Sequence, residues 1–224
     1  MLLGEDALRR GTRGTYASSI VSSTQLATVV AAYAQPGVAT LTGFKWIGRV
    51  PGLAFGYEEA IGYCVDPGAV RDKDGITALV RVLALVAGLR AAGQTVAGRL
   101  DEIAATYGVV LTGQLSARVE DLSEITGAMA RLRASPPSEL AGEAVAVTDL
   151  ADGLGDLPPT DAVRLEGSTV RVVVRPSGTE PKLKAYLEAR VPLDRTAGVA
   201  ADRAQAAATL ARLRAEVRTA LGLG

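Results

Sequence analysis

The chain has no histidine and a single cysteine, and these two scarcities exclude several kinds of site. Without histidine it cannot build a Ser-His-Asp or Cys-His catalytic centre, or a histidine-bearing zinc site, from its own residues. With Cys64 alone it cannot form an internal disulfide, which fits a reducing compartment. Any chemistry therefore has to use carboxylates, lysines or hydroxyls.

An excess of charge of either sign is also missing, because 24 basic residues balance 24 acidic ones. No global field draws the chain to nucleic acid or to an anionic membrane, so anion recognition has to be local. The start lacks a basic region followed by a sustained apolar run. The most apolar segment, residues 76–89, is interrupted by Arg81 and is shorter than the roughly 20 residues of a membrane-spanning helix. We expect a core helix there, and a cytoplasmic protein.

The first part of the chain, residues 1–116, has the pattern of an α/β layered domain. The expected elements are helices over residues 1–10, 25–34, 76–90 and 96–107 and strands over residues 17–21 and 38–41. In the helix over residues 76–90, Leu79, Val82, Leu83 and Val86 repeat at helical spacing and form the expected inward face. Strands that alternate with helices favour a mixed sheet covered by helices.

The second part, residues 117–224, favours a smaller α+β domain. An extended stretch over residues 109–119 spans the boundary, and beyond it we expect helices over residues 122–132 and 200–221 and strands over residues 143–149, 169–174 and 183–191. Ala207, Leu210, Leu213 and Val217 mark the inward face of the last helix. The last two strands form a hairpin with a long polar tip. With 48% hydrophobic residues, the chain can bury a core in each domain.

The hairpin tip, residues 175–182, gathers groups that bind anions. Arg175 offers a planar fork of N–H donors, and Ser177 and Thr179 offer hydroxyls. Gly178 lets backbone N–H groups approach a ligand without a side chain in the way. A tetrahedral phosphate satisfies all of them, whereas the alternative is a long turn whose residues serve backbone geometry and whose charges lie in water.

Three earlier loops carry side chains suited to a sugar phosphate. Lys45 stands between two aromatic residues, Glu58 and Glu59 are adjacent in an apolar segment, and Lys73 precedes a helix. Each has a plainer interpretation: a surface lysine, helix-capping acids and a helix lead-in. Together they provide carboxylates for sugar hydroxyls and lysines for phosphate, and charge-assisted hydrogen bonds contribute roughly 1.5–3 kcal/mol each.

These loops, in this order, resemble the α-D-phosphohexomutase superfamily, closest to its phosphomannomutase/phosphoglucomutase and phosphopentomutase-like branch. The matching motifs are Thr42-Gly43-Phe44-Lys45-Trp46, Gly56-Tyr57-Glu58-Glu59-Ala60-Ile61-Gly62, Arg71-Asp72-Lys73-Asp74-Gly75 and Arg175-Pro176-Ser177-Gly178-Thr179. The resemblance covers essentially the whole chain, but only the last two domains of a family that has four.

The resemblance implies a substrate-binding role for each motif. The implied substrate-binding residues are Gly43, Lys45, Glu58, Glu59, Lys73, Arg175, Ser177, Gly178, Thr179 and Lys184. Those of the last motif, with Lys184, hold the non-reacting phosphate, and those of the first three hold the sugar. In the family reaction, an enzyme phosphoserine and Mg²⁺ pass a phosphoryl group to the sugar through a hexose 1,6-bisphosphate, which turns around between two transfers.

Two departures from the family pattern limit what the resemblance implies. Ala60 stands where many relatives have serine, which removes one hydroxyl contact to the sugar. The chain also shows neither a catalytic serine loop nor an Asp-Gly-Asp-Gly-Asp-Arg metal loop, so neither catalytic residues nor Mg²⁺ ligands are expected in it. We therefore predict a C-terminal half that is inactive alone and needs an N-terminal catalytic half. The alternatives are a non-catalytic phosphosugar-binding module and a remnant without function.

Overall fold

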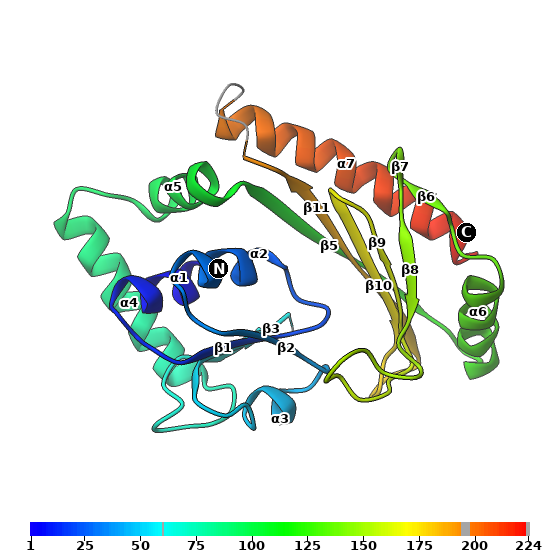
Figure 1. Ribbon diagram of the computed structural model, residues 1–224, viewed down its shortest axis with the longest axis horizontal. Helices are drawn as coiled ribbons and strands as arrows, with labels where there is room; N and C mark the ends of the chain where they lie inside the picture. Colours follow the sequence, from blue (N-terminus) through cyan, green and yellow to red (C-terminus); the bar gives the residue numbers. More distant parts are fainter. Residues whose placement is uncertain (60, 194–197, 223–224) are drawn as a thin grey trace. The chain divides into compact units, whose positions relative to one another are not determined.

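The computed structural model describes residues 1–59, 61–193 and 198–222 (Figure 1). The chain forms two compact units, residues 1–107 and 108–224, and each is described by itself. The sequence placed the boundary after residue 116, whereas the units divide ahead of strand β5 (Val109–Arg118). This strand pairs along its whole length with β11 (Lys182–Val191), which makes it part of the second unit.

The first unit is built on a four-stranded sheet in the order β2-β1-β3-β4. Its strands are β1 (Thr15–Ser19), β2 (Gly37–Thr40), β3 (Leu53–Glu58) and β4 (Gly62–Cys64). β1 runs parallel to β2 and β3, while β4 returns antiparallel beside β3. The predicted mixed sheet is therefore confirmed, although the sequence analysis did not predict the β3–β4 pair.

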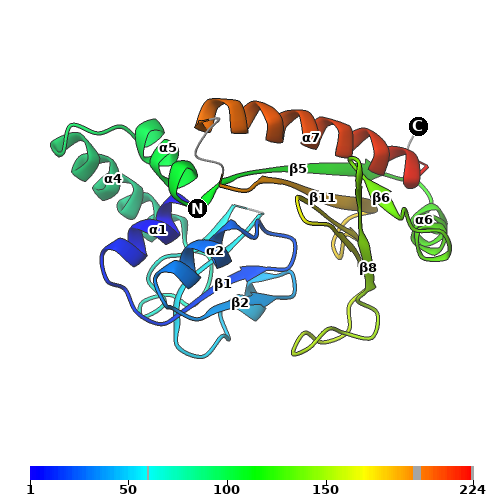
Figure 2. The same cartoon turned by 45° about the horizontal axis from the view of Figure 1, so that its top comes forward.

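Helices cover both faces of this sheet (Figures 1 and 2). The helices are α1 (Leu2–Arg9), α2 (Gln25–Ala32), α3 (Phe44–Ile47), α4 (Gly75–Ala91) and α5 (Val96–Tyr107). On one face, Tyr16 and Phe55 pack with apolar residues of α1 and α2, and on the other, Ala17 packs with Phe44 and Ile47 of α3. Neighbouring residues of β1 thus serve different cores, as the alternation of a strand requires.

Helix α4 has the predicted extent, but the prediction that it is a core helix is wrong. Its buried residues are Ala78, Leu85 and Leu89, whereas the predicted inward residues Leu79 and Leu83 are 56% and 60% exposed. The helix is apolar on nearly every side, so the spacing of its apolar residues does not select one face. Among the described helices, no single one has the length and apolarity to cross a membrane. The bent pair of α4 and α5, with 90° between the two helices, reaches the required length and apolarity only when the two are taken together.

The second unit contains a five-stranded antiparallel sheet in the order β5-β11-β10-β9-β8. Its remaining elements are α6 (Leu122–Ala134), β6 (Glu139–Leu140), β7 (Glu143–Ala144), β8 (Ala146–Asp149), β9 (Val163–Glu166), β10 (Val170–Pro176) and α7 (Val199–Ala220). The predicted hairpin is the β10–β11 pair. The sequence analysis did not predict β9.

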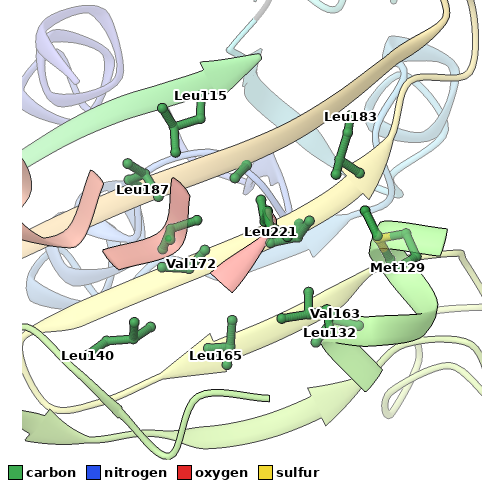
Figure 3. Packing of buried hydrophobic residues seen from close by; sticks show 14 of the residues in the cluster. Leu115, Met129, Leu132, Leu140, Val163, Leu165, Val172, Leu183, Leu187 and Leu221 are labelled. Atoms are coloured by element: carbon green, nitrogen blue, oxygen red, sulfur yellow. The ribbon is translucent and has the colours of Figure 1, made fainter. Parts of the chain in front are cut away.

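One face of this sheet packs against α6 and α7 and forms the core of the unit (Figure 3). Val172, Leu183 and Leu187 point into that core from the two central strands, with Met129 of α6 and Leu213 of α7 opposite them. The alternating residues of β11 lie on the other face and are polar. The inward face predicted for the last helix is confirmed at Leu213 and Val217, whereas Ala206 is buried in place of the predicted Ala207.

Candidate functional site

The predicted sugar-binding residues of the first unit follow the carboxyl ends of parallel strands. β2 leads into Gly43 and Lys45, and β3 ends at Glu58, which Glu59 follows. Because β1, β2 and β3 are parallel, these ends meet at one edge of the sheet, where open α/β sheets bind ligands. The fold thus brings the first two motifs to a common edge.

Glu58 and Lys73 form an ion pair at this edge. The Lys73 Nζ donates to the Glu58 Oε1 at 2.9 Å, and the Glu58 carboxylate is 9% exposed while the lysine side chain is 50% exposed. The hydrogen bond to Glu58 is the main cause that raises the pKa of Lys73 above its usual value. The buried carboxylate therefore has the partner it needs, and the half-exposed ammonium keeps donors for a ligand.

Two neighbours hold Lys73 in place. The Arg71 guanidinium donates to the carbonyls of Gly48 and Val50 at 3.0 and 2.7 Å, which ties the loop to the segment after α3. Asp74 caps α4 by accepting hydrogen bonds from the Ile76 and Thr77 amides. These bonds are structural, so of this motif only Lys73 is directed to the strand edge.

Asp74 was also considered for the Mg²⁺ that the resemblance implies. Both of its carboxylate oxygens accept amides of α4, and hydrogen bonds from Thr77 and Ile76 hold its pKa below the usual range. Within residues 1–59, 61–193 and 198–222, no group of three or more acidic or cysteine side chains is arranged to hold a metal ion. The residues described here therefore do not fit a Mg²⁺ site.

Gly62 allows the Glu58–Lys73 pair to lie close to the backbone of β4. A Cβ at this position would lie 2.9 Å from the Glu58 Cγ, 3.1 Å from a ring carbon of Phe44 and 3.2 Å from the Lys73 Cδ. Any larger residue would push the pair apart. The motif over residues 56–62 includes this glycine, but only the structure shows which side chains pack against it.

Lys45, Gly43 and Glu59 also lie at this edge. Lys45 is exposed, and its Nζ lies 5.8 Å from the ring centroid of Trp46, as in the alternative of a surface lysine. Gly43 has φ +106° at the start of α3, a conformation that favours glycine. Glu59 is exposed in the turn after β3, and Ala60 lies outside the described residues.

The sequence analysis missed hydroxyls at the same edge. Ser19, the last residue of β1, and Ser22 are both 3% exposed, and their Oγ atoms lie 2.9 Å apart. The N-cap residue of α2, Thr24, makes no side-chain cap hydrogen bond. The signal was two pairs of serines, at positions 18–19 and 22–23, at the end of β1 and just after it.

In the second unit, the predicted phosphate loop connects β10 and β11. The loop closes through two backbone bonds, from the Ser177 amide to the Lys182 carbonyl at 2.8 Å and from the Lys182 amide to the Glu180 carbonyl at 2.7 Å. Arg175 and Lys184 are cross-strand partners at its base. Residues 178–180 are exposed. The loop thus presents Gly178 and Thr179 to solvent above a pair of cations.

The charge around this loop is mostly positive. Arg118 of β5 pairs with Lys182, and Arg175 pairs with Lys184, so four cations lie at one end of the sheet. The single acid of the loop, Glu180, is held by Lys182 at 2.9 Å, and this bond is the main cause that lowers the pKa of Glu180. The Arg175 guanidinium makes no hydrogen bond or ion pair with any residue that the structure describes. Its guanidinium is therefore available to an anion.

Gly178 has no structural reason to be glycine. Its φ is not in the left-handed region, and an added Cβ would meet no atom within 4 Å. Neither backbone conformation nor packing within the chain requires the missing side chain. An ion lying directly on the loop would require it, because a side chain there would separate the ion from the loop amides.

Comparisons with known proteins agree with both units. Residues 1–107 match the family description "Phosphoglucomutase/phosphomannomutase, alpha/beta/alpha domain III", and residues 85–206 match "Phosphoglucomutase/phosphomannomutase, C-terminal domain". The chain belongs to the phosphoglucomutase/phosphomannomutase family. The resemblance on which the sequence analysis relied is thereby confirmed, and so is its restriction to the last two domains. Proteins of this family are isomerases.

The amino-acid sequence is also similar to those of individual sugar-phosphate mutases. The chain is 48% identical over 183 residues to a probable phosphomannomutase of Haemophilus influenzae, covering 81% of this chain and 37% of that protein. It is 32% identical over 202 residues to a probable phosphoribomutase of Schizosaccharomyces pombe, covering 77% and 34%. The chain therefore spans little more than a third of the length of these relatives.

Solved structures share the fold. The phosphoglucomutase parafusin of Paramecium, in an open form, matches with a TM-score of 0.72 and 19% identity, over 98% of this chain and 40% of that one. A putative phosphomannomutase of Thermus thermophilus matches with a TM-score of 0.62 and 22% identity, over 96% and 39%. At these identities, the likeness supports the fold of the two domains alone.

Proposed function

We propose that this chain is the part of a phosphohexomutase that binds a phosphosugar, with the first unit holding the sugar and the second holding the phosphate that does not react. The observation that carries the proposal is the loop after β10, where Arg175 lacks a partner among the described residues and lies beside Lys184. The names of the relatives support phosphosugars as the substrate class.

The phosphate is held by charge and by a cradle of donors. Arg175 donates two N–H groups in a fixed fork, and Lys184 adds a point charge across the strand pair. Ser177 and Thr179 add hydroxyls, and Gly178 leaves the loop amides open to the ion. Since these groups recognise only a phosphate, they accept either end of a sugar bisphosphate, as a mutase requires.

The sugar is held at the carboxyl edge of the parallel strands. Glu58 accepts from a ring hydroxyl, while Lys73 forms an ion pair with its carboxylate and donates to the ligand. Glu59, Lys45 and the backbone at Gly43 line the same edge. Carboxylates and ammonium groups together match a polyol, because each hydroxyl both donates and accepts.

The transfer chemistry belongs to the preceding domains of the family, which supply the phosphoserine and Mg²⁺. The purified chain should show no mutase activity with glucose 1-phosphate or mannose 1-phosphate, while calorimetry should show that it binds these compounds weakly. Adding separately expressed N-terminal domains should restore turnover. Turnover by the chain alone, or the absence of any phosphosugar binding, would contradict the proposal, and binding without restored turnover would favour a non-catalytic binding module.

A further inference from the structure

Helix α4 carries a second apolar stripe that is exposed, although the helix buries other apolar residues within its own unit. Ile76, Leu79, Val80 and Leu83 are 73%, 56%, 60% and 60% exposed. Their spacing of three and four residues places them on one side of the helix. A surface helix normally turns charged or polar residues outward, and this one turns four large aliphatic residues outward.

The opposite side of α4 explains how the helix is attached to its own unit. Ala78, Leu85 and Leu89 are buried there, and the Arg81 guanidinium donates to the Asp6 carboxylate of α1 at 3.1 Å. The inward face and its ion pair therefore account for the packing within the unit. The exposed stripe is a separate surface, and its large contiguous apolar area is typical of an interaction site.

We propose that the exposed stripe of α4 is the docking surface for the domains that precede domain III in this family, whether these lie on the same chain or on another. Two observations favour this occupant. The relatives carry most of their length outside the matched region, since the chain covers 37% of the Haemophilus influenzae protein. In addition, α1, at the amino-terminal end of the domain, is bonded to α4, so a preceding domain joins the unit beside this helix.

The inference rests on the proposed function only in its choice of partner, and it explains the composition of α4. A helix that is apolar on both sides is buried on both sides in the assembled protein. Domains that associate permanently bury apolar faces of this kind, whereas loosely associated ones meet through polar faces. The stripe therefore predicts a lasting association.

The test uses the chain with an affinity tag, co-expressed with the domains that precede domain III in the Haemophilus influenzae probable phosphomannomutase. The unsubstituted chain should retain the untagged domains through purification. Leu79→Glu and Leu83→Glu, singly and together, should raise the apparent Kd by about tenfold or more, because each would bury a charge without a partner. Thermal unfolding of the chain alone should not change, since both side chains are exposed.

Leu122→Glu is the matched control, because Leu122 is also a helical leucine, is 64% exposed, and lies at the start of α6 in the second unit. It should leave retention unchanged. The inference is overturned if the unsubstituted chain fails to retain the domains, or if the α4 variants retain them equally well. It is also overturned if the substitutions instead abolish self-association of the chain or its binding to phospholipid vesicles. Phosphosugar binding measured on the same variants should be intact, so a failure of the proposed function would be seen separately.

Discussion

Replacement of Arg175 by alanine tests the phosphate loop most sharply. The side chain is half-buried at the end of β10, opposite Lys184, and has no partner among the described residues that its removal would leave unpaired. The stability of the chain should therefore change by no more than about 0.5 kcal/mol, as for surface substitutions. The effect on ligand binding should be much larger.

Its magnitude follows from the contacts that the guanidinium would lose. Hydrogen bonds to a charged group contribute about 1.5–3 kcal/mol each. At about 1.4 kcal/mol for each factor of ten, loss of the arginine should weaken phosphosugar binding by about tenfold to a hundredfold. Arg175→Lys should restore part of the affinity, because it keeps the charge but not the planar fork.

Isothermal titration calorimetry with mannose 1-phosphate measures this change. Arg212→Ala is the matched control, since it removes one positive charge from the same unit but lies on α7, where the arginine pairs with Glu216. It should bind as the unsubstituted chain does. Equal affinities for Arg175→Ala and the unsubstituted chain would refute the assignment of the loop.

Three further predictions concern other residues. Glu143 accepts hydrogen bonds from Ser168, Thr169 and Val170, which outweigh its burial and lower its pKa below the ordinary 4.5. The ionised Glu143 therefore stabilises the fold above pH 4.5, and this contribution is lost as the pH falls through the lowered pKa. In urea unfolding, Glu143→Gln should lower the free energy of unfolding by about 1–3 kcal/mol at pH 7 and by less in acid. Burial raises the pKa of Cys64 to about 11, so a thiol reagent at pH 8 should label this cysteine only after the chain unfolds. Rapid labelling of the native chain would contradict this prediction. Gly62→Ala should weaken phosphosugar binding in calorimetry, whereas Gly68→Ala, a glycine of the neighbouring loop, should not.

The sequence predicted much of the fold because its local patterns were strong. The hairpin of β10 and β11 is confirmed. Its strands were recognisable because a sheet that is buried on one face imposes a period of two on a strand such as β11. The β3–β4 pair was missed because β3 is buried on both faces and therefore shows no alternation. The inward face of α4 was predicted wrongly for a related reason, because apolar residues surround this helix and their spacing does not select one face.

The candidate site was predictable as a set of residues but not as an arrangement. The motifs contained Glu58 and Lys73, but only the fold shows that they form an ion pair over Gly62. Adjacent acids and a distant lysine carry no local signal of contact, since the distance between them is set by the pairing of β3 with β4. The motif over residues 71–75 likewise gave no indication that Arg71 and Asp74 make structural hydrogen bonds.

A titration of the ¹⁵N-labelled chain with mannose 1-phosphate, followed by NMR, tests the central claim that the proposed residues bind a phosphosugar. The amides of Gly178 and Thr179 in the phosphate loop should shift, and so should those of Glu58 and Lys73 at the strand edge. Unchanged amide shifts in the phosphate loop would contradict the account.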